Sequence, residues 1–221
     1  MRWFFQVFWI PIYRWWGLRH IRRVRRFRLA GLRLEVPPGV FHPGVYFSTP
    51  IFIKFLQTID FQGKTALDVG TGSGALALFA AQNGATATAL DINPLAVETA
   101  RRNAAANGLA LRVVESDLLD KLPAEQFDFV LINPPYYPRQ PRNATEHAFF
   151  AGENHEYFQK LFAQLPVFRH SGSRAWMIVS EDCDMEAIGH IAQQHGQRLE
   201  IIFEKKKWGE RLWVVEICDL P

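Results

Sequence analysis

The segment Ile132-Asn-Pro-Pro-Tyr136 places a carboxamide, two prolines and a phenol directly after the apolar run Phe127–Ile132. The Asn133 carboxamide oxygen and the Pro134 carbonyl can each accept one N–H hydrogen bond, and the Tyr136 ring offers a face for stacking. Because proline fixes φ, two prolines in succession make this turn stiff. These groups are suited to holding and orienting a planar group that carries N–H donors, and that task requires neither a metal ion nor a nucleophilic side chain.

A second segment, Asp68-Val-Gly-Thr-Gly-Ser-Gly74, lies between the aliphatic run TALDV and the small-residue helical pattern ALALFAAQNG. This order predicts a strand, a tight turn and a helix start. The glycines let the backbone approach a ligand closely, and the helix start presents free N–H groups. Asp68, at the strand end, is placed to face an ammonium group. The GxGxG spacing differs from the GxGxxG of dinucleotide sites, and a turn of this kind can also simply pack a helix on a sheet.

Two further acidic residues come at the ends of predicted strands, Asp91 in LDINP and Asp117 in ESDL. Ligands of parallel sheets bind where the carboxyl ends of the strands meet, so both side chains are expected in one site. A carboxylate there can accept two hydroxyl donors in a charge-assisted contact. The alternative for Asp91 is a helix cap before Asn93-Pro94.

Asp68–Gly74 resembles motif I of class I S-adenosylmethionine (SAM) methyltransferases. Asn133–Tyr136 resembles the active-site motif of those that act on planar sp² nitrogens, which are exocyclic base amines and glutamine side-chain amides. The resemblance implies SAM as cofactor, no metal, and a catalytic role for Asn133, Pro134 and Tyr136. The cofactor-binding residues that it implies are Thr49, Asp68, Gly70, Thr71, Gly72, Gly74, Asp91, Ile92, Asp117 and Asn133.

The resemblance also assigns roles within this set. Asp91 would take both ribose hydroxyls, Ile92 would lie against the adenine, and Asp117 would contact the adenine amino group. Tyr-Phe-Ser-Thr-Pro50 is similar to an upstream motif whose Thr-Pro closes over the methionine carboxylate, here Thr49-Pro50. Helix capping by Ser48 or Thr49, with Pro50 at the first helical position, explains the same residues.

Residues 146–157 and Met177–Glu181 are similar to the HemK/PrmC-like branch, the methyltransferase small domain group, which methylates glutamine in release factors. That branch has a long helical N-terminal domain for its protein substrate, and we expect no counterpart of it in the short basic arm of this sequence. The substrate, protein or nucleic acid, therefore stays open. We expect His147 and His155 to lie on the surface of a loop or helix, and Lys205–Lys207 to form a solvated hairpin.

From residue 63 onward, strand and helix patterns alternate, which predicts a mainly parallel α/β sheet with an antiparallel last pair, a Rossmann-like seven-strand layout. The segment joining Leu199–Glu204 to Leu212–Ile217 is too short for a parallel crossover. Alternation in FRLAGLRLEV, with a turn near Gly31, predicts a hairpin. We therefore divide the chain into an N-terminal arm with hairpin (1–36) and a SAM-dependent methyltransferase domain (37–221).

Nine arginines and no acidic residue occur in residues 1–33, and the remaining 188 residues hold 16 basic and 22 acidic residues, a net charge of −6. Arginines interleaved with aromatic residues suit RNA contact or a membrane headgroup layer, or the aromatics simply pack the arm onto the domain. No apolar run reaches the roughly 20 residues that span a bilayer. Two distant cysteines, Cys183 and Cys218, predict neither disulfides nor a zinc site, which indicates the cytoplasm, with membrane-peripheral contact as the variant.

These observations favour a SAM-dependent N-methyltransferase acting on a protein or nucleic-acid substrate. One rival interpretation is a catalytically silent methyltransferase fold that docks on RNA or a membrane, which measurable methyl transfer would exclude. The other is a nicotinamide oxidoreductase, which would bind NAD in place of SAM and which the GxGxG spacing disfavours.

Overall fold

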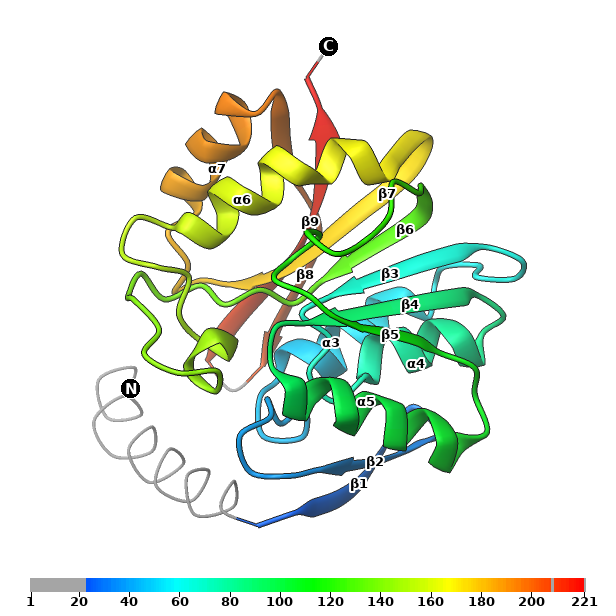
Figure 1. Ribbon diagram of the computed structural model, residues 1–221. Coiled ribbons are helices and arrows are strands. Elements are labelled where there is room, and N and C mark those ends of the chain that lie inside the picture. Colours follow the sequence, from blue (N-terminus) through cyan, green and yellow to red (C-terminus); the bar gives the residue numbers. More distant parts are fainter. Residues whose placement is uncertain (1–22, 208, 221) are drawn as a thin grey trace.

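The computed structural model describes residues 23–207 and 209–220, which fold around a seven-stranded sheet with helices on both faces (Figure 1). The strand order is β5-β4-β3-β6-β7-β9-β8, in which β3 to β7 pair in parallel and β9 pairs antiparallel with both β7 and β8. The predicted fold class is thereby confirmed. The strands are β3 (Thr65–Val69), β4 (Thr86–Asp91), β5 (Arg112–Glu115), β6 (Phe127–Ile132), β7 (Arg169–Ser180), β8 (Gln197–Lys207) and β9 (Glu210–Asp219).

Helices cover the sheet because successive strand residues point to opposite faces. On β3, Ala66 joins the apolar cluster with the helices of one face, and Leu67 joins the cluster of the other face. The first face carries α3 (Ser48–Leu56), α4 (Ala75–Gln82) and α5 (Pro94–Asn107). The second carries α6 (Glu156–Gln164) and α7 (Met185–Gln194), and the short 3₁₀ turns are η2 (Glu146–Ala148) and η3 (Leu165–Phe168). Within the described ranges, no helix is both long and apolar enough to cross a bilayer.

The order of the strands reverses at β3. The chain leaves β3 toward one edge through β4 and β5, and it returns at β6 on the opposite side of β3. In open α/β sheets such a switch point opens a crevice at the carboxyl ends of the strands. The glycine turn follows β3 and Asn133 follows β6, so the two segments singled out from the sequence flank this crevice.

The predicted hairpin is present as β1 (Arg25–Leu29) and β2 (Leu32–Val36). Its two turn residues, Ala30 and Gly31, both have positive φ (49° and 86°), as in the two-residue turns that match strand twist. β2 lies on α5, where the Asn103 side chain accepts the Glu35 N–H at 2.9 Å. Residues 1–22, which hold most of the predicted arm, lie outside the described residues.

One local prediction, the start of α3, was wrong. The helix begins at Ser48 and is preceded by Phe47 in helical conformation, with no side-chain cap, so neither Ser48 nor Thr49 caps it and Pro50 is its third residue. The reason is tertiary, because Thr49 is already helical and its hydroxyl is bound to the loop after β6.

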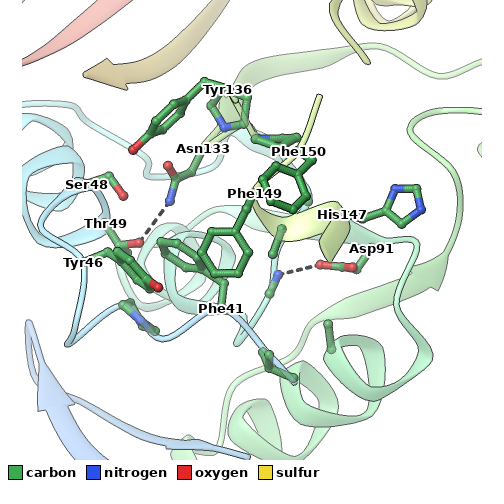
Figure 2. Close-up of a pocket in the computed structure, with 18 of the residues that line it drawn as sticks. Phe41, Tyr46, Ser48, Thr49, Asp91, Asn133, Tyr136, His147, Phe149 and Phe150 are labelled. Carbon is green, nitrogen blue, oxygen red and sulfur yellow. Dashed lines mark hydrogen bonds between the residues drawn. The ribbon is translucent and has the colours of Figure 1, made fainter. Parts of the chain in front are cut away.

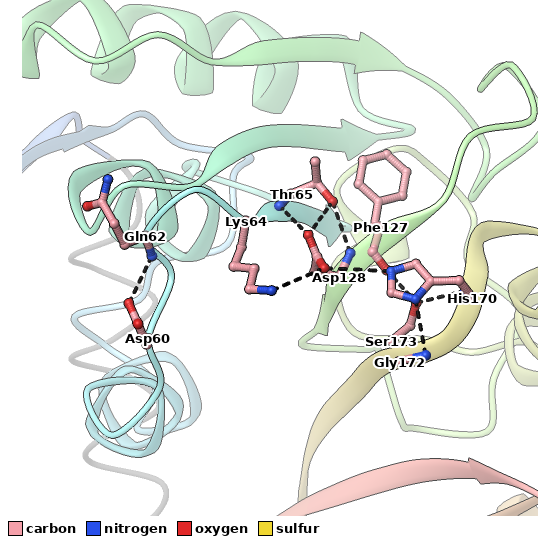
Figure 3. A network of polar contacts seen from close by, with 9 residues as sticks. All are labelled: Asp60, Gln62, Lys64, Thr65, Phe127, Asp128, His170, Gly172 and Ser173. Atoms are coloured by element: carbon pink, nitrogen blue, oxygen red, sulfur yellow. Dashed lines mark hydrogen bonds and ion pairs between the residues drawn. The ribbon is translucent and has the colours of Figure 1, made fainter.

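At the amino ends of β3 and β6, opposite the crevice, a polar network around Asp128 joins the two strands (Figure 3). The Thr65 backbone N–H and hydroxyl donate to Asp128 Oδ2 at 2.8 and 3.0 Å, which ties β3 to β6. Lys64 Nζ and His170 Nε2 lie 3.7 and 3.6 Å from Asp128 Oδ1. These donors, the Thr65 N–H first, lower the pKa of Asp128. The network fixes the ends of the strands opposite the candidate site.

Candidate active site

A cavity of about 1640 Å³ opens at the carboxyl ends of the parallel strands. Its wall takes residues from the segments after β3, β4, β5 and β6, and from the loop that precedes α3. It therefore unites segments that are far apart in the chain. The predicted residues that line it are Thr49, Gly70, Thr71, Gly72, Asp91, Ile92, Asp117, Asn133, Pro134 and Tyr136.

Asp91 lies across the glycine turn, with one backbone donor on each carboxylate oxygen. Gly72 N–H donates to Oδ2 at 2.8 Å (Figure 2). Asn93 N–H donates to Oδ1 at 2.9 Å. Burial raises the pKa of Asp91, and these two N–H bonds oppose the rise. The cap of α5 is Asn93, whose Oδ1 accepts the Leu95 N–H at 3.0 Å, so Asp91 is not needed for that task. Each carboxylate oxygen keeps capacity for a further donor from the cavity.

Asp68 lies beneath the glycine turn and is absent from the cavity wall, unlike the placement expected from the sequence. Its Oδ2 accepts the Thr71 hydroxyl at 2.6 Å and the Ala77 N–H at 3.1 Å, which holds the turn against the first residues of α4. Its Oδ1 is buried and has no hydrogen-bond partner among the described residues. Burial raises the pKa of Asp68 to about 7.

Two of the three glycines serve different purposes. Gly70 has φ +76°, and a Cβ built on it meets no atom within 4 Å, so this glycine keeps the backbone bare beside the cavity. Gly74 has φ +85° and does not line the cavity, since a Cβ there would come within 3.2 Å of Ala100 Cα. Its task is the close packing of the turn on α5.

Asn133 is oriented by a residue 84 positions away. Its Nδ2 donates to the Thr49 hydroxyl oxygen at 3.2 Å, and Thr49 is buried in the first turn of α3 (Figure 2). With its N–H group engaged in this way, the carboxamide presents Oδ1 as the acceptor for a group in the cavity. Thr49 lines the same cavity, as the sequence predicted, but its visible contact is with Asn133.

Tyr136 is half-buried at the same end of the cavity. Burial raises the pKa of its phenol, and a hydrogen bond with Ser180, at the end of β7, opposes this rise. The hydroxyl therefore stays neutral at physiological pH and the bond to Ser180 restrains the ring.

Sequence reasoning missed an aromatic cluster between Asn133 and Asp91. Phe41 stacks on Tyr46 with ring centroids 4.7 Å apart, and Phe149 lies 6.0 and 5.6 Å from them (Figure 2). The first two rings come from the loop before α3 and the third from the loop after β6. The only signal in the sequence was the density of aromatic residues in two segments otherwise read as loops, FHPGVYF and HAFF.

The histidine expectations have different outcomes. His147 is exposed in η2, as expected, and lies beside Asp91 in Figure 2. His155 was expected on the surface but is buried, because it adopts a left-handed conformation (φ 59°) just before α6 and packs edge-on against Phe158.

The expectation of a solvated hairpin at Lys205–Lys207 does not hold for its last residue. Lys207, at the end of β8, does not extend into solvent, since its Nζ lies 4.5 Å from the Phe47 ring centre.

The cavity fits an adenosyl cofactor on its own geometry. Carboxylates Asp91 and Asp117 stand at neighbouring strand ends to accept hydroxyl and amino donors, and Ile92 and Leu118 supply apolar walls. Beneath the turn, the unpartnered Asp68 Oδ1 calls for a donor that the described residues do not supply. In the described ranges, no group of three His, Cys, Asp or Glu side chains could hold a metal ion.

Comparisons with known proteins agree with this geometry. The family model of the methyltransferase small domain matches residues 31–203. A putative protein N5-glutamine methyltransferase of Methanocaldococcus jannaschii is 28% identical, over 87% of this chain and 98% of its own length. The ribosomal RNA small subunit methyltransferase C of Chromohalobacter salexigens is 36% identical over 52% of this chain, which spans only 35% of that protein.

Solved structures show the same fold. A methyltransferase from Pyrococcus furiosus superposes with a TM-score of 0.65 at 24% identity, covering 86% of this chain and 90% of its own. A 16S rRNA methyltransferase of T. thermophilus, in complex with AdoMet and guanosine, has a TM-score of 0.67 at 18% identity and covers 90% of this chain and 50% of its own.

Proposed function

The chain belongs to the methyltransferase small domain family and is an S-adenosyl-L-methionine-dependent methyltransferase, and from this premise we propose that it methylates a planar sp² nitrogen. The target is a carboxamide of a glutamine side chain or the exocyclic amine of a nucleic-acid base. Both groups share the chemistry that the cavity addresses, which is a delocalised lone pair and N–H donors in one plane.

The observation that carries the proposal is the orientation of Asn133. Its Nδ2 is engaged by Thr49 at 3.2 Å, so Oδ1 is the atom that accepts an N–H from the target. The Pro134 carbonyl is a second acceptor on the same stiff turn. Two acceptors on one turn match the two hydrogens of a primary amide or amine.

Tyr136 completes the target site. Its ring, restrained by Ser180, lines the cavity next to Asn133 and can stack on the flat target group. Its neutral phenol is no base, and neither is Asn133 or Pro134. The bound cofactor supplies the electrophilic methyl group, while the residues of the chain bind the nitrogen, aim it, and accept hydrogen bonds that strengthen as positive charge grows on it.

One labelling experiment distinguishes the proposed methyltransferase from the catalytically silent alternative. Methyl-labelled SAM is incubated with a cell lysate and the purified protein, and label is measured in RNA, DNA and protein fractions. We expect label in one fraction, and we expect Asn133→Ala to lower its rate by about 10²–10³ because one preorganised acceptor is lost. Affinity for S-adenosyl-L-homocysteine (SAH), measured by calorimetry, serves as the control and should be unchanged.

Label in the protein fraction assigns the substrate to proteins, and label in a nucleic-acid fraction assigns it to nucleic acids. Absence of label in all fractions from a folded, SAH-binding protein supports the silent module. An Asn133→Ala protein that methylates at the wild-type rate rejects the assignment of the active site.

We also propose that the basic N-terminal surface contacts RNA. In the described part of the chain, Arg23, Arg26 and Arg28 are exposed, whereas Phe27 between them stacks inward on His42 with ring centroids 5.0 Å apart. Arginine forks suit phosphate oxygens, and although Arg26 also pairs with Glu35 at 2.7 Å, Val24 is the one exposed large apolar side chain among the described residues of this surface, which offers little to the acyl region of a membrane.

Affinity for a single-stranded RNA oligomer should fall with salt, by about 0.7 decades per phosphate contact per decade of salt. The double variant Arg23→Gln/Arg28→Gln should reduce the slope while SAH affinity persists. Preferential pelleting of the protein with anionic vesicles, without RNA binding, would assign this face to a membrane surface and reject the proposal.

A further inference from the structure

The loop after β5, residues 116–122, carries Asp117 into the cavity in a strained conformation. Leu118 has φ +51°, is buried and lines the cavity next to Asp117. A residue with a side chain, such as leucine, costs free energy in the left-handed region, and such strain persists only where the neighbouring structure holds it. The element that holds this loop is α6, which contacts it directly.

Two α6 side chains one helical turn apart make this connection. Lys160 Nζ lies 2.6 Å from Asp117 Oδ2 and 2.6 Å from Asp120 Oδ2. Gln164 accepts the Leu119 N–H at 3.1 Å through Oε1 and donates to Asp120 Oδ1 at 2.5 Å through Nε2. Residues four apart on a helix share a face, so this one face of α6 engages both ends of the strained residue.

We propose that Lys160 is a positioning residue that aims Asp117 at the exocyclic amine of the cofactor's adenine and thereby sets selectivity for an aminopurine. The inference rests on the proposed function for the presence of the cofactor, and on the resemblance of Asp117 to the family's adenine-contacting acid for the place of the adenine. The lysine ammonium occupies Asp117 Oδ2, which leaves Oδ1 as the acceptor for a ligand N–H. Without Lys160 the carboxylates of Asp117 and Asp120 repel each other, and the aim of Asp117 is lost.

The chemistry distinguishes adenine from hypoxanthine at one atom. The adenine amino group donates a hydrogen bond to a carboxylate oxygen, whereas the hypoxanthine carbonyl at the same position is an acceptor and opposes it. A correctly aimed Asp117 should therefore bind SAH more tightly than S-inosylhomocysteine, in which that amino group is replaced by oxygen. The ratio of the two affinities reports on the aim of Asp117, and a role of Lys160 in folding alone would leave it unchanged.

The test is calorimetry with these two probes, which requires no methyl acceptor. Asp117→Ala should lower the SAH to S-inosylhomocysteine affinity ratio by about tenfold or more, because a hydrogen bond to a charged group is lost. Lys160→Met should lower it about two- to fivefold, the range for loss of an exposed ion pair. Lys160→Arg keeps the charge and should keep the ratio.

Lys121→Met is the matched control, because it removes one exposed positive charge from the same loop without touching the Asp117 ion pair. Gln164→Leu tests the second connection and should also lower the ratio, which keeps the proposal testable where Lys160→Met folds poorly. An unchanged ratio in folded Lys160→Met, with the ratio reduced in Asp117→Ala, overturns the role of Lys160. An unchanged ratio in Asp117→Ala overturns the inference as a whole. Neither result bears on label transfer or on Asn133→Ala, which test the proposed function.

Discussion

Replacement of Asp68 by asparagine should stabilise the ligand-free protein above pH 7 and weaken its binding of SAH. Asp68 is 1% exposed, and burial raises its pKa from 3.8 to about 7 against the opposing bonds from Thr71 and Ala77. The folded chain therefore opposes ionisation of this carboxyl group. Asparagine has nearly the same shape and can still accept those two hydrogen bonds, but it carries no charge.

The size of the effect follows from the pKa difference. A rise from 3.8 to about 7 is roughly three units, which at about 1.4 kcal/mol per unit corresponds to about 4 kcal/mol at most. Between these pH values the folded state holds a proton that the unfolded state has lost. The stabilisation is complete below about pH 4 and is lost as the pH rises through 7, so the free energy of unfolding of the wild type should fall relative to the variant.

The assay is urea unfolding at several pH values from 5 to 8, for wild type and Asp68→Asn, with Glu153→Gln as a control that removes an exposed carboxylate. The variant should gain relative to wild type as the pH rises from 5 to 7 and level off above it. Calorimetry at pH 8 should show weaker SAH binding, because the amide nitrogen that replaces the unpartnered Asp68 Oδ1 beneath the turn cannot accept a hydrogen bond. Parallel stability profiles of the two proteins from pH 5 to 8 would refute the argument that burial controls this group.

Three further changes test other contacts. Gly72→Val puts a branched side chain at φ +56° facing Phe41, so the free energy of unfolding should fall by about 1–2 kcal/mol and SAH affinity, measured by calorimetry, should drop. Retained affinity in the folded variant would show that the glycine is not needed for the ligand. Thr49→Val removes the acceptor of the Asn133 amide, so methyl transfer should fall about tenfold or more while SAH affinity and Thr49→Ser activity persist. If Thr49→Val lowers SAH affinity and leaves the rate of methyl transfer unchanged, Thr49 contacts the methionine carboxylate of the cofactor, as the resemblance implies. Asp128→Asn should lower the free energy of unfolding by about 1 kcal/mol at pH 7, because a carboxylate whose pKa is lowered stabilises the fold above its unfolded pKa. Urea unfolding should show this difference shrink as the pH falls from 7 through the folded pKa, and a difference that is independent of pH would contradict it.

Much of the architecture could be predicted from the chain alone, because it depends on local pattern. The apolar run Phe127–Ile132 has the bounds of β6, and the alternation of strand and helix patterns after residue 63 predicted the mainly parallel sheet that the structure shows. The short connection between β8 and β9 allowed only an antiparallel pair. Ligands of parallel sheets bind at the carboxyl ends of the strands. This rule predicted that the glycine turn, Asp91 and Asn133 lie together at that end of the sheet.

The contacts that specify the site were decided by tertiary structure. Thr49 and Asn133 meet because α3 packs on β7 and β9 with its first turn at the loop after β6, and no spacing in the sequence indicates that pair. Gly70 and Gly74 belong to the same GxGxG motif, but Gly70 lines the cavity whereas Gly74 packs against α5. Asp68 lies under the turn because its carboxylate bonds to the start of α4. Residue type and spacing determine which groups are present and which strand carries them, whereas their partners depend on how separate elements pack, and that packing is set by the whole core.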